Sequence, residues 1–153
     1  MKKYLLLFSL IIIGLSACDK NEVATQATID DAKIQAYIKA NNITGLTKDP
    51  SGIYYKVMTP GTGPYPVYAP TSSTVQVAYS FTYLDGQTGQ SASDVSLLLS
   101  STVLGFQIAL THINQTGRLY FIIPSNLGYG SVSNGAVPPN AVLIYTLDLI
   151  GFY

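Results

Sequence analysis

The C-terminal half of this 153-residue sequence offers few side chains that could work together as an acid, a base or a nucleophile. Between residues 75 and 153 the charged side chains are Asp85, Asp94, Arg118 and Asp148. His112 is the only histidine, and no carboxylate lies near it in sequence. There is no His/Cys/Asp cluster with metal spacing, no nucleophile elbow and no phosphate-binding loop. We therefore expect neither a metal nor a cofactor, and an enzyme here would have to work without a strong acid–base pair.

Rotation about the peptide bond before a proline is one of the few reactions that such a site can catalyse. The barrier is about 18–20 kcal/mol, because twisting removes the amide resonance. An apolar aromatic pocket favours the less polar twisted state, and hydrogen bonds to its carbonyl add to the effect, so that catalysis is differential binding. The chain contains 12 tyrosines and 5 phenylalanines. Only 10% of its residues are charged, where about 25% is usual.

The periodicity of apolar residues predicts the elements that would position these aromatic side chains. Residues 28–42 predict a helix with Ile34, Tyr37 and Ile38 on one face, which would dock on the domain or space it from a membrane. A loop follows over residues 59–70, a short apolar run over 95–99 and a short helix over 106–113. Strands are predicted over residues 53–58, 74–83, 118–123 and 141–150, the last in a central position. The expected fold is α+β, with an antiparallel sheet and a helix packed on one face.

The N-terminal residues have the features of an export signal followed by a membrane anchor. Lys2 and Lys3 precede an apolar run over residues 4–15, which is too short for a comfortable membrane span. Leu15-Ser16-Ala17-Cys18 then looks like the lipobox of a bacterial lipoprotein, and a buried thiol is the alternative for Cys18. The domain boundaries that we expect are 1–17 for a lipoprotein signal peptide, 18–27 for a lipidated tether, 28–50 for a helix and linker, and 51–153 for the main domain.

These features define the partners and the location that the sequence predicts. Cys18 is the only cysteine, so no intrachain disulfide can form, and acylation there would attach the protein to a membrane. The location would be the bacterial cell envelope, facing the periplasm or associated with the outer membrane. The net charge is zero, so nothing favours nucleic acid as a partner. We expect a monomer.

Several motifs resemble those of the FK506-binding-protein (FKBP) type peptidyl-prolyl cis–trans isomerases. Residues 75–86 resemble the family's V-x-V-x-Y-T-G-x-L-x-D-G, and residues 103–106 stand where the family has V-I-x-G-W. Residues 118–130 match R-x-x-x-x-I-P-x-x-L-A-Y-G, and residues 137–143 match I-P-P-N-A-x-L. The resemblance implies an FKBP-like twisted sheet of four to five strands wrapped on one short helix, plus the N-terminal helix. It also implies an isomerase that acts on proline-containing polypeptides and assists the folding of exported proteins.

The resemblance implies catalytic residues as well. Tyr79 and Tyr145 would form aromatic walls of a pocket. Phe106 would be its floor, in place of the family's tryptophan. The backbone amide of Val103 and the hydroxyl of Tyr129 would each reach a carbonyl of the bound peptide.

One wall of the implied pocket departs from the family pattern. Where the family has the phenylalanine and aspartate of F-D-S-S, this sequence has Gly89 and Gln90. Losing a buried phenylalanine removes about 1.5–3 kcal/mol of apolar contact. Gln90 would contact the substrate, Val137 would line the rim, and Val95 or Leu97 would replace a missing aromatic. The alternatives are thus an isomerase of full or reduced activity, a weak or inactive module that binds proline-containing peptides or a partner protein, and a structural lipoprotein.

Overall fold

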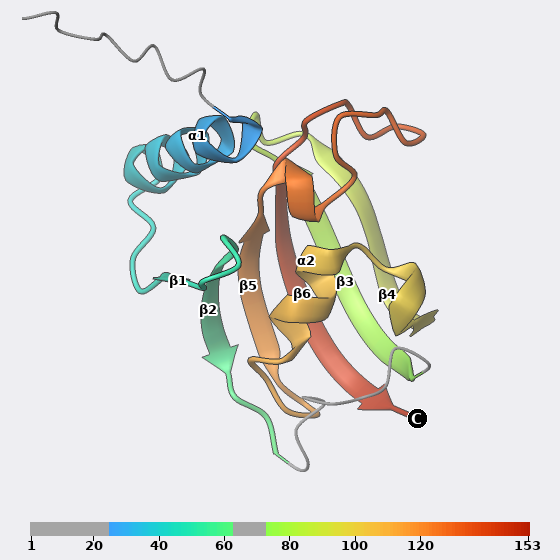
Figure 1. Cartoon of the computed structure of the whole chain (residues 1–153). Helices are drawn as coiled ribbons and strands as arrows, with labels where there is room; N and C mark the ends of the chain where they lie inside the picture. The colour runs from blue at the N-terminus through green and yellow to red at the C-terminus, as the bar shows by residue number, and fades with distance from the viewer. Residues whose placement is uncertain (1–24, 63–72) are drawn as a thin grey trace, which may run out of the picture.

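The computed structural model describes residues 25–62 and 73–153 (Figure 1). Cys18, the predicted signal peptide and most of the predicted tether lie outside the described residues, as do residues 63–70 of the predicted 59–70 loop. The elements are α1 (Gln26–Ala40), β1 (Thr47–Lys48), β2 (Tyr54–Thr59), β3 (Thr74–Tyr83), β4 (Thr88–Leu98), η1 (Leu99–Ser101), α2 (Leu104–Leu110), β5 (Arg118–Ile123), η2 (Ser125–Leu127) and β6 (Leu143–Phe152). In these two ranges, no helix has the length and apolar character that crossing a membrane requires.

The strands form one antiparallel sheet in the order β1-β2-β5-β6-β3-β4. The described residues therefore contain six strands, where the sequence predicts four to five. β6 pairs with both β5 and β3, which confirms its predicted central position. Figure 1 shows the sheet curving around α2. The α+β class is confirmed.

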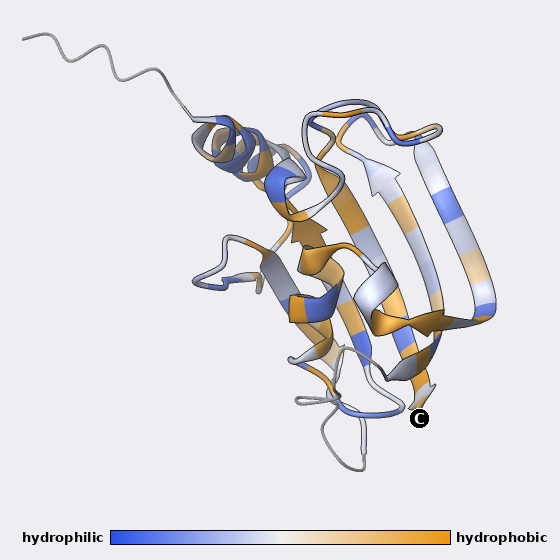
Figure 2. Ribbon diagram, turned by 45° about the vertical axis from the view of Figure 1, so that its right-hand side comes forward, coloured by the Kyte–Doolittle hydropathy of each residue, from blue (hydrophilic) through white to orange (hydrophobic). Residues whose placement is uncertain are grey.

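β4 is the strand that the sequence pattern underestimates. The apolar run at 95–99 covers only its end, and the strand extends back to Thr88. Its first half is rich in Ser, Gln, Gly and Ala, none of which is among the residues enriched in strands, and Figure 2 shows mostly polar residues there. As an edge strand, β4 pairs only with β3. The register shifts twice, between Val77 and Tyr79 and between Phe81 and Thr82, so β4 carries two irregularities.

Two apolar clusters lie on opposite faces of the sheet. Phe121 on β5 belongs to the larger cluster, together with Phe106 and Leu110 of α2. The next residue on β5, Ile122, points the other way, because side chains alternate along a strand, and it joins Ile34 of α1. Ile34 has no exposed surface. Of the two roles expected for the N-terminal helix, the structure therefore shows docking on the domain.

The helix ends differ from those that the sequence predicts. α1 begins at Gln26, two residues before the predicted start, because Thr25 caps it: the Thr25 side chain accepts a hydrogen bond from the Thr28 amide at 3.4 Å. α2 begins two residues earlier than predicted and ends at Leu110. The amides of His112 and Ile113 donate to carbonyls three residues back, so the predicted last turn of this helix tightens into irregular structure.

Candidate active site

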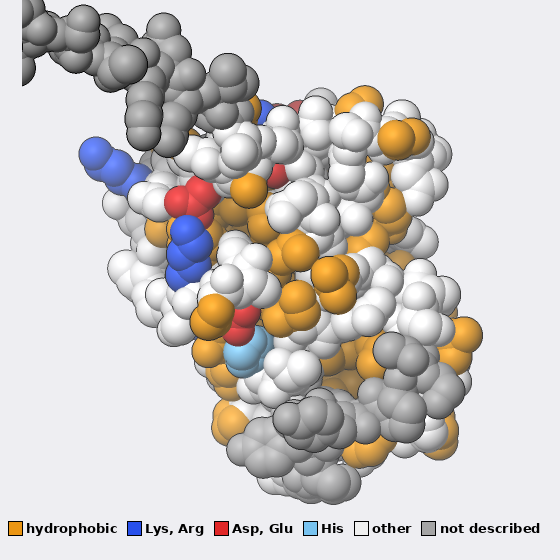
Figure 3. All heavy atoms as spheres, viewed as in Figure 1, with side chains coloured by type: hydrophobic (Ala, Val, Ile, Leu, Met, Phe, Trp, Pro, Cys, Tyr) orange, Lys and Arg blue, Asp and Glu red, His pale blue; other side chains and the backbone are white. Residues whose placement is uncertain are grey.

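Five residues proposed as catalytic converge on one small hollow beside the start of α2. Tyr79 comes from β3, Val103 and Phe106 from α2 and its cap, Tyr129 from the loop after η2, and Tyr145 from β6. The hollow has a volume of about 140 Å³ and is also lined by Leu97, Ser101 and Thr102. None of its lining residues is charged. Figure 3 shows the charged side chains of this face mainly near α1 and β1, away from α2 and β4.

The aromatic rings of the hollow hold one another in place. Phe106 is 3% exposed, and its ring lies edge-on to those of Tyr79 at 6.4 Å and Tyr145 at 5.8 Å. Tyr79 and Tyr145 lie 6.0 Å apart, and Phe121 stacks beneath Tyr145 at 5.1 Å. Edge-to-face and offset pairs at these distances are attractive beyond the area they bury. The hollow is therefore a cup of aromatic rings that pack on one another.

Four groups that can donate hydrogen bonds belong to residues lining the hollow. In the described parts of the chain, the hydroxyls of Tyr79, Tyr129 and Tyr145 have no hydrogen-bond partner, and the amide of Val103 donates to none. Burial raises the pKa of Tyr145 far above its usual value and raises the pKa of Tyr79, with the nearby Tyr129 adding to both. Both hydroxyls therefore stay protonated at neutral pH and can donate a hydrogen bond.

A hydrogen-bonded loop presents Tyr129. Pro124 follows β5, and the carbonyl of Ser125 accepts from the amides of Gly128 at 3.0 Å and Gly130 at 2.8 Å. Gly130 has a φ of +71°, which a residue with a side chain rarely adopts. The base of the loop is joined to α1, since the amide and hydroxyl of Ser125 both donate to Oδ2 of the fully buried Asp30. The N-terminal helix thus holds the loop that carries Tyr129.

A second hollow of about 330 Å³ adjoins the first, and Tyr129 lines both. Gln90 and Val137, which the sequence assigns to substrate binding, line this second hollow. Its outer wall is a loop closed by paired hydrogen bonds between Asn134 and Val137 at 3.0 and 3.1 Å. Val137 is 8% exposed, so it is buried at the base of this loop and does not lie on the predicted rim.

Val95 and Leu97, the two residues expected to replace a missing aromatic side chain of the pocket, lie in different environments. Leu97 lines the first hollow. Val95 pairs with Val77 and packs against the larger apolar cluster, but it lies outside the lining of both hollows. The substrate-binding role expected for Val95 therefore has no geometric support, because its partly buried side chain packs against the larger cluster instead.

Phe81 is a site residue that the sequence motifs do not predict, and it lines the second hollow together with Gly89. Its ring lies 5.0 Å from that of Tyr145 and is 2% exposed. The expectation that this wall lacks an aromatic ring is therefore wrong. One sequence feature could have indicated this aromatic ring, because Phe81 stands where the family has the glycine of Y-T-G.

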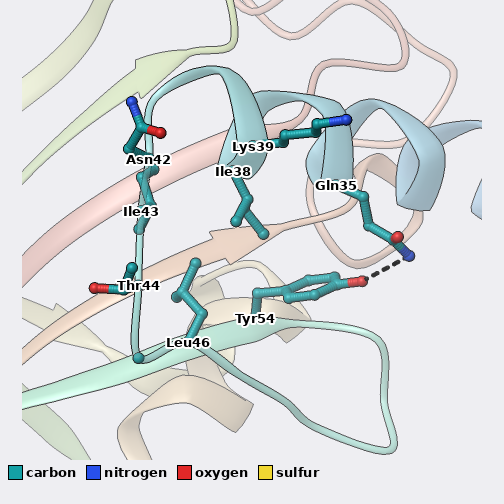
Figure 4. Close-up of a pocket in the computed structure, with 9 residues that line it drawn as sticks. Gln35, Ile38, Lys39, Asn42, Ile43, Thr44, Leu46 and Tyr54 are labelled. Atoms are coloured by element: carbon teal, nitrogen blue, oxygen red, sulfur yellow. Dashed lines mark hydrogen bonds between the residues drawn. The ribbon is translucent and has the colours of Figure 1, made fainter.

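His112 lies outside both hollows. Its ring stacks on Tyr55 at 3.8 Å, and its Nε2 is 3.2 Å from Oδ2 of Asp49, without the geometry of a hydrogen bond. A hollow of about 540 Å³ also lies apart from the site, between α1 and the β1–β2 region. Gln35, Ile38 and Tyr54 point into it (Figure 4), and no predicted site residue lines it.

The sheet wrapped around one short helix places the chain in a known class of fold. Over 82% of its length it superposes on the crystal structure of FkpA from Escherichia coli, with a TM-score of 0.71, 26% identity and 60% of that chain covered. A peptidyl-prolyl cis–trans isomerase from Pseudomonas syringae pv. tomato shares the fold with a TM-score of 0.68 at 24% identity, over 84% of this chain and 96% of that one.

The chain belongs to the FKBP-type peptidyl-prolyl cis–trans isomerase family, whose sequence profile matches residues 66–150. It is 29% identical to FkpA of Buchnera aphidicola subsp. Schizaphis graminum over 73% of this chain and 45% of the relative. For the FkpA of E. coli K12 the identity is 28%, over 69% of this chain and 40% of the relative. The chain thus spans less than half the length of these relatives. The Legionella longbeachae protein named outer membrane protein MIP is 30% identical over 98% of this chain and 64% of the relative.

Proposed function

We propose that this chain catalyses cis–trans isomerisation of X–Pro peptide bonds in exported polypeptides at the bacterial cell envelope. The observation that carries the proposal is the convergence of Tyr79, Val103, Phe106, Tyr129 and Tyr145 on one uncharged hollow. Its 140 Å³ correspond to the liquid volume of about five water molecules. A space of that size suits one small ring better than a drug-sized ligand, which needs about 300–1,000 Å³.

The mechanism is stabilisation of the twisted amide by contacts that the planar amide makes less well. The proline ring enters the hollow and rests on Phe106, between Tyr79 and Tyr145. The twisted carbonyl has lost its conjugation and needs less solvation than the planar one, so the dry aromatic cup favours it. The Val103 amide and the Tyr129 hydroxyl donate to carbonyls of the peptide and hold it in register. No bond is made or broken, and no proton moves.

Replacing Tyr129 by phenylalanine tests the role of its hydroxyl while keeping the ring. We expect kcat/KM for an X–Pro peptide to fall by about 2- to 10-fold, since one neutral hydrogen bond contributes about 0.5–1.5 kcal/mol. NMR exchange spectroscopy on the peptide, with the purified full chain as catalyst, measures the rate directly. Tyr153→Phe is the matched control, because Tyr153 is 77% exposed and its hydroxyl donates to Gln76 on the sheet.

The same experiment separates the isomerase from a binding module. Exchange cross-peaks between the cis and trans peptide that grow with added chain support catalysis. Peptide-induced shifts at Tyr129 without such cross-peaks would show binding alone and would overturn the proposal. Neither shifts nor exchange would leave a structural role.

We also propose that acylation of Cys18 anchors the chain to a membrane. The support is the sequence Leu15-Ser16-Ala17-Cys18 after a short apolar run, together with a relative that is named an outer membrane protein. Cys18→Ser is expected to abolish incorporation of an alkyne-labelled fatty acid and to move the protein from the membrane fraction to the soluble fraction. Labelling that persists in Cys18→Ser, or membrane association that is unchanged, would refute the anchor.

A further inference from the structure

The ring of Phe81 and the missing side chain of Gly89 fit one another across the β3–β4 pair. A Cβ at position 89 would come within 2.5–2.6 Å of Cδ2 and Cζ of Phe81, and closer still to Cε2. Real Cβ atoms essentially never approach so closely, so any side chain at 89 would have to displace the Phe81 ring. The register places Phe81 opposite Gln90 and Thr82 opposite Thr88, which leaves Gly89 as the extra residue of a bulge.

The family pattern has the two residue types in the opposite places. It has glycine at the position of Phe81, in Y-T-G, and phenylalanine at the position of Gly89, in F-D-S-S. In this chain the ring comes from β3 and the glycine from β4. This pair of positions therefore carries one aromatic residue in both sequence patterns, at the β3 position in this chain and at the β4 position in the family motif.

Phe81 connects the two hollows of the site. On one side its ring packs against Tyr145, which lines the first hollow, of about 140 Å³. On the other side it lines the second hollow, of about 330 Å³, next to Gly89 and Gln90 and the Asn134–Val137 loop. A second ring contact, edge-on with Tyr83 at 5.8 Å, holds the Phe81 ring from the end of β3. Tyr83 in turn donates a hydrogen bond to the carbonyl of Ala136 in the loop.

We propose that Phe81 and Gly89 form a matched pair, in which the missing side chain of Gly89 leaves the space that the Phe81 ring fills. The Phe81 ring then supplies both the aromatic wall of the site and the floor of the second hollow. The residue next to the proline of the bound peptide lies against this floor. This inference rests on the proposed isomerase function for its substrate, but not for the fit between the two residues. Among the described residues, those that line this second hollow are all uncharged, so the residue next to the proline would meet apolar and uncharged polar groups there.

A cycle of four proteins tests the pair: the unmodified chain, Phe81→Gly, Gly89→Phe and the double variant Phe81→Gly/Gly89→Phe. Phe81→Gly removes a buried ring, and Gly89→Phe forces two rings into the space of one. We expect each single change to lower the melting temperature and to reduce kcat/KM by about tenfold or more. The double variant should recover most of both, to within about threefold of the original kcat/KM, because the two sites are in contact and couple strongly.

Two milder variants keep the test informative if Phe81→Gly or Gly89→Phe fails to fold. Phe81→Leu keeps most of the apolar volume, and we expect it to change the ratio of kcat/KM for Phe-Pro and Ala-Pro peptides at least threefold. Val77→Ala is the matched control, since Val77 is fully buried on the same strand but lines neither hollow. It should lower stability and leave the ratio unchanged.

The outcomes distinguish this inference from the proposed function. Additive losses of stability in the double variant would overturn the matched pair, whether or not the chain is an isomerase. Coupled stabilities with an unchanged peptide ratio in Phe81→Leu would overturn the substrate-facing role and leave a packing role. If the unmodified chain does not catalyse exchange, the proposed function fails, and the melting temperatures still decide whether the two residues are matched.

Discussion

Phe106→Ala is expected to lower the free energy of unfolding by about 3–5 kcal/mol and kcat/KM for X–Pro peptides by about 10- to 100-fold. The ring is 3% exposed and touches three other rings, those of Tyr79, Phe121 and Tyr145. Its removal therefore leaves a cavity in the core and takes away the floor on which the proline ring rests. Urea denaturation measures the first effect, and exchange spectroscopy measures the second.

Two further variants separate stability from activity in this experiment. Leu110→Ala, on the same helix and 2% exposed, should cost a comparable 2–5 kcal/mol yet change kcat/KM less than threefold, because Leu110 does not line the hollow. Phe106→Leu should retain most of the stability and still lose activity, since it lacks the flat ring. Equal activity losses in Leu110→Ala and Phe106→Ala would show that the effect of Phe106 is on folding alone.

Asp30→Ala is expected to lower the free energy of unfolding by about 2–5 kcal/mol, because it leaves two buried donors of Ser125 without an acceptor. The amide of Ser125 lies 2.8 Å and its hydroxyl 2.5 Å from Oδ2 of Asp30, and the Asp30 side chain has no exposed surface. Because Ser125 begins the loop that carries Tyr129, we also expect kcat/KM to fall. Denaturation and exchange spectroscopy again provide the two measurements.

The next residue on the helix supplies the control. Asp31 is partly exposed and pairs with Lys48, and surface ion pairs contribute about 0–1 kcal/mol. It also accepts hydrogen bonds from Gln35 and from the Tyr54 hydroxyl, which the side-chain oxygen of an asparagine can still accept. Asp31→Asn should therefore change stability by no more than about 1 kcal/mol and leave kcat/KM unaltered. Asp30→Asn should fall between the two, since its side-chain oxygen can still accept one hydrogen bond. A cost for Asp30→Ala no larger than that for Asp31→Asn would mean that α1 does not support the loop.

The parts of the fold that sequence patterns predict are those where one local signal is strong. The bounds of β3 and β5 agree with the predicted ranges, because both strands alternate or run apolar between clear breaks. Half of β4 is missed, because an edge strand with one solvated face needs few apolar residues. The limits of α2 shift, since the tight bonds after Leu110 depend on the tertiary position of its last turn.

In the candidate site, too, the residues that belong to clear sequence motifs could be predicted, and those that depend on tertiary contacts could not. Ordered motifs lead to Tyr79, Phe106 and Tyr129, and the structure brings these residues together. The fit of Phe81 to Gly89 depends on a bulge, which single-residue comparison does not show. The hydrogen bonds from Ser125 to Asp30 span 95 positions, and nothing in the sequence distinguishes Asp30, which becomes buried, from its neighbour Asp31.

The irregular register of β4 has a consequence for a protein whose proposed substrates are unfolded chains. An unfolded chain can pair with the free N–H and C=O groups of a straight, exposed edge strand, and such pairing leads to aggregation. At one side of this sheet the edge strand is β1, only two residues long and ending in Lys48. At the other side, β4 is interrupted twice and carries Asp94. Within the described residues neither edge offers a long regular template, so a polypeptide bound in the aromatic hollow would find little sheet edge on which to add a strand.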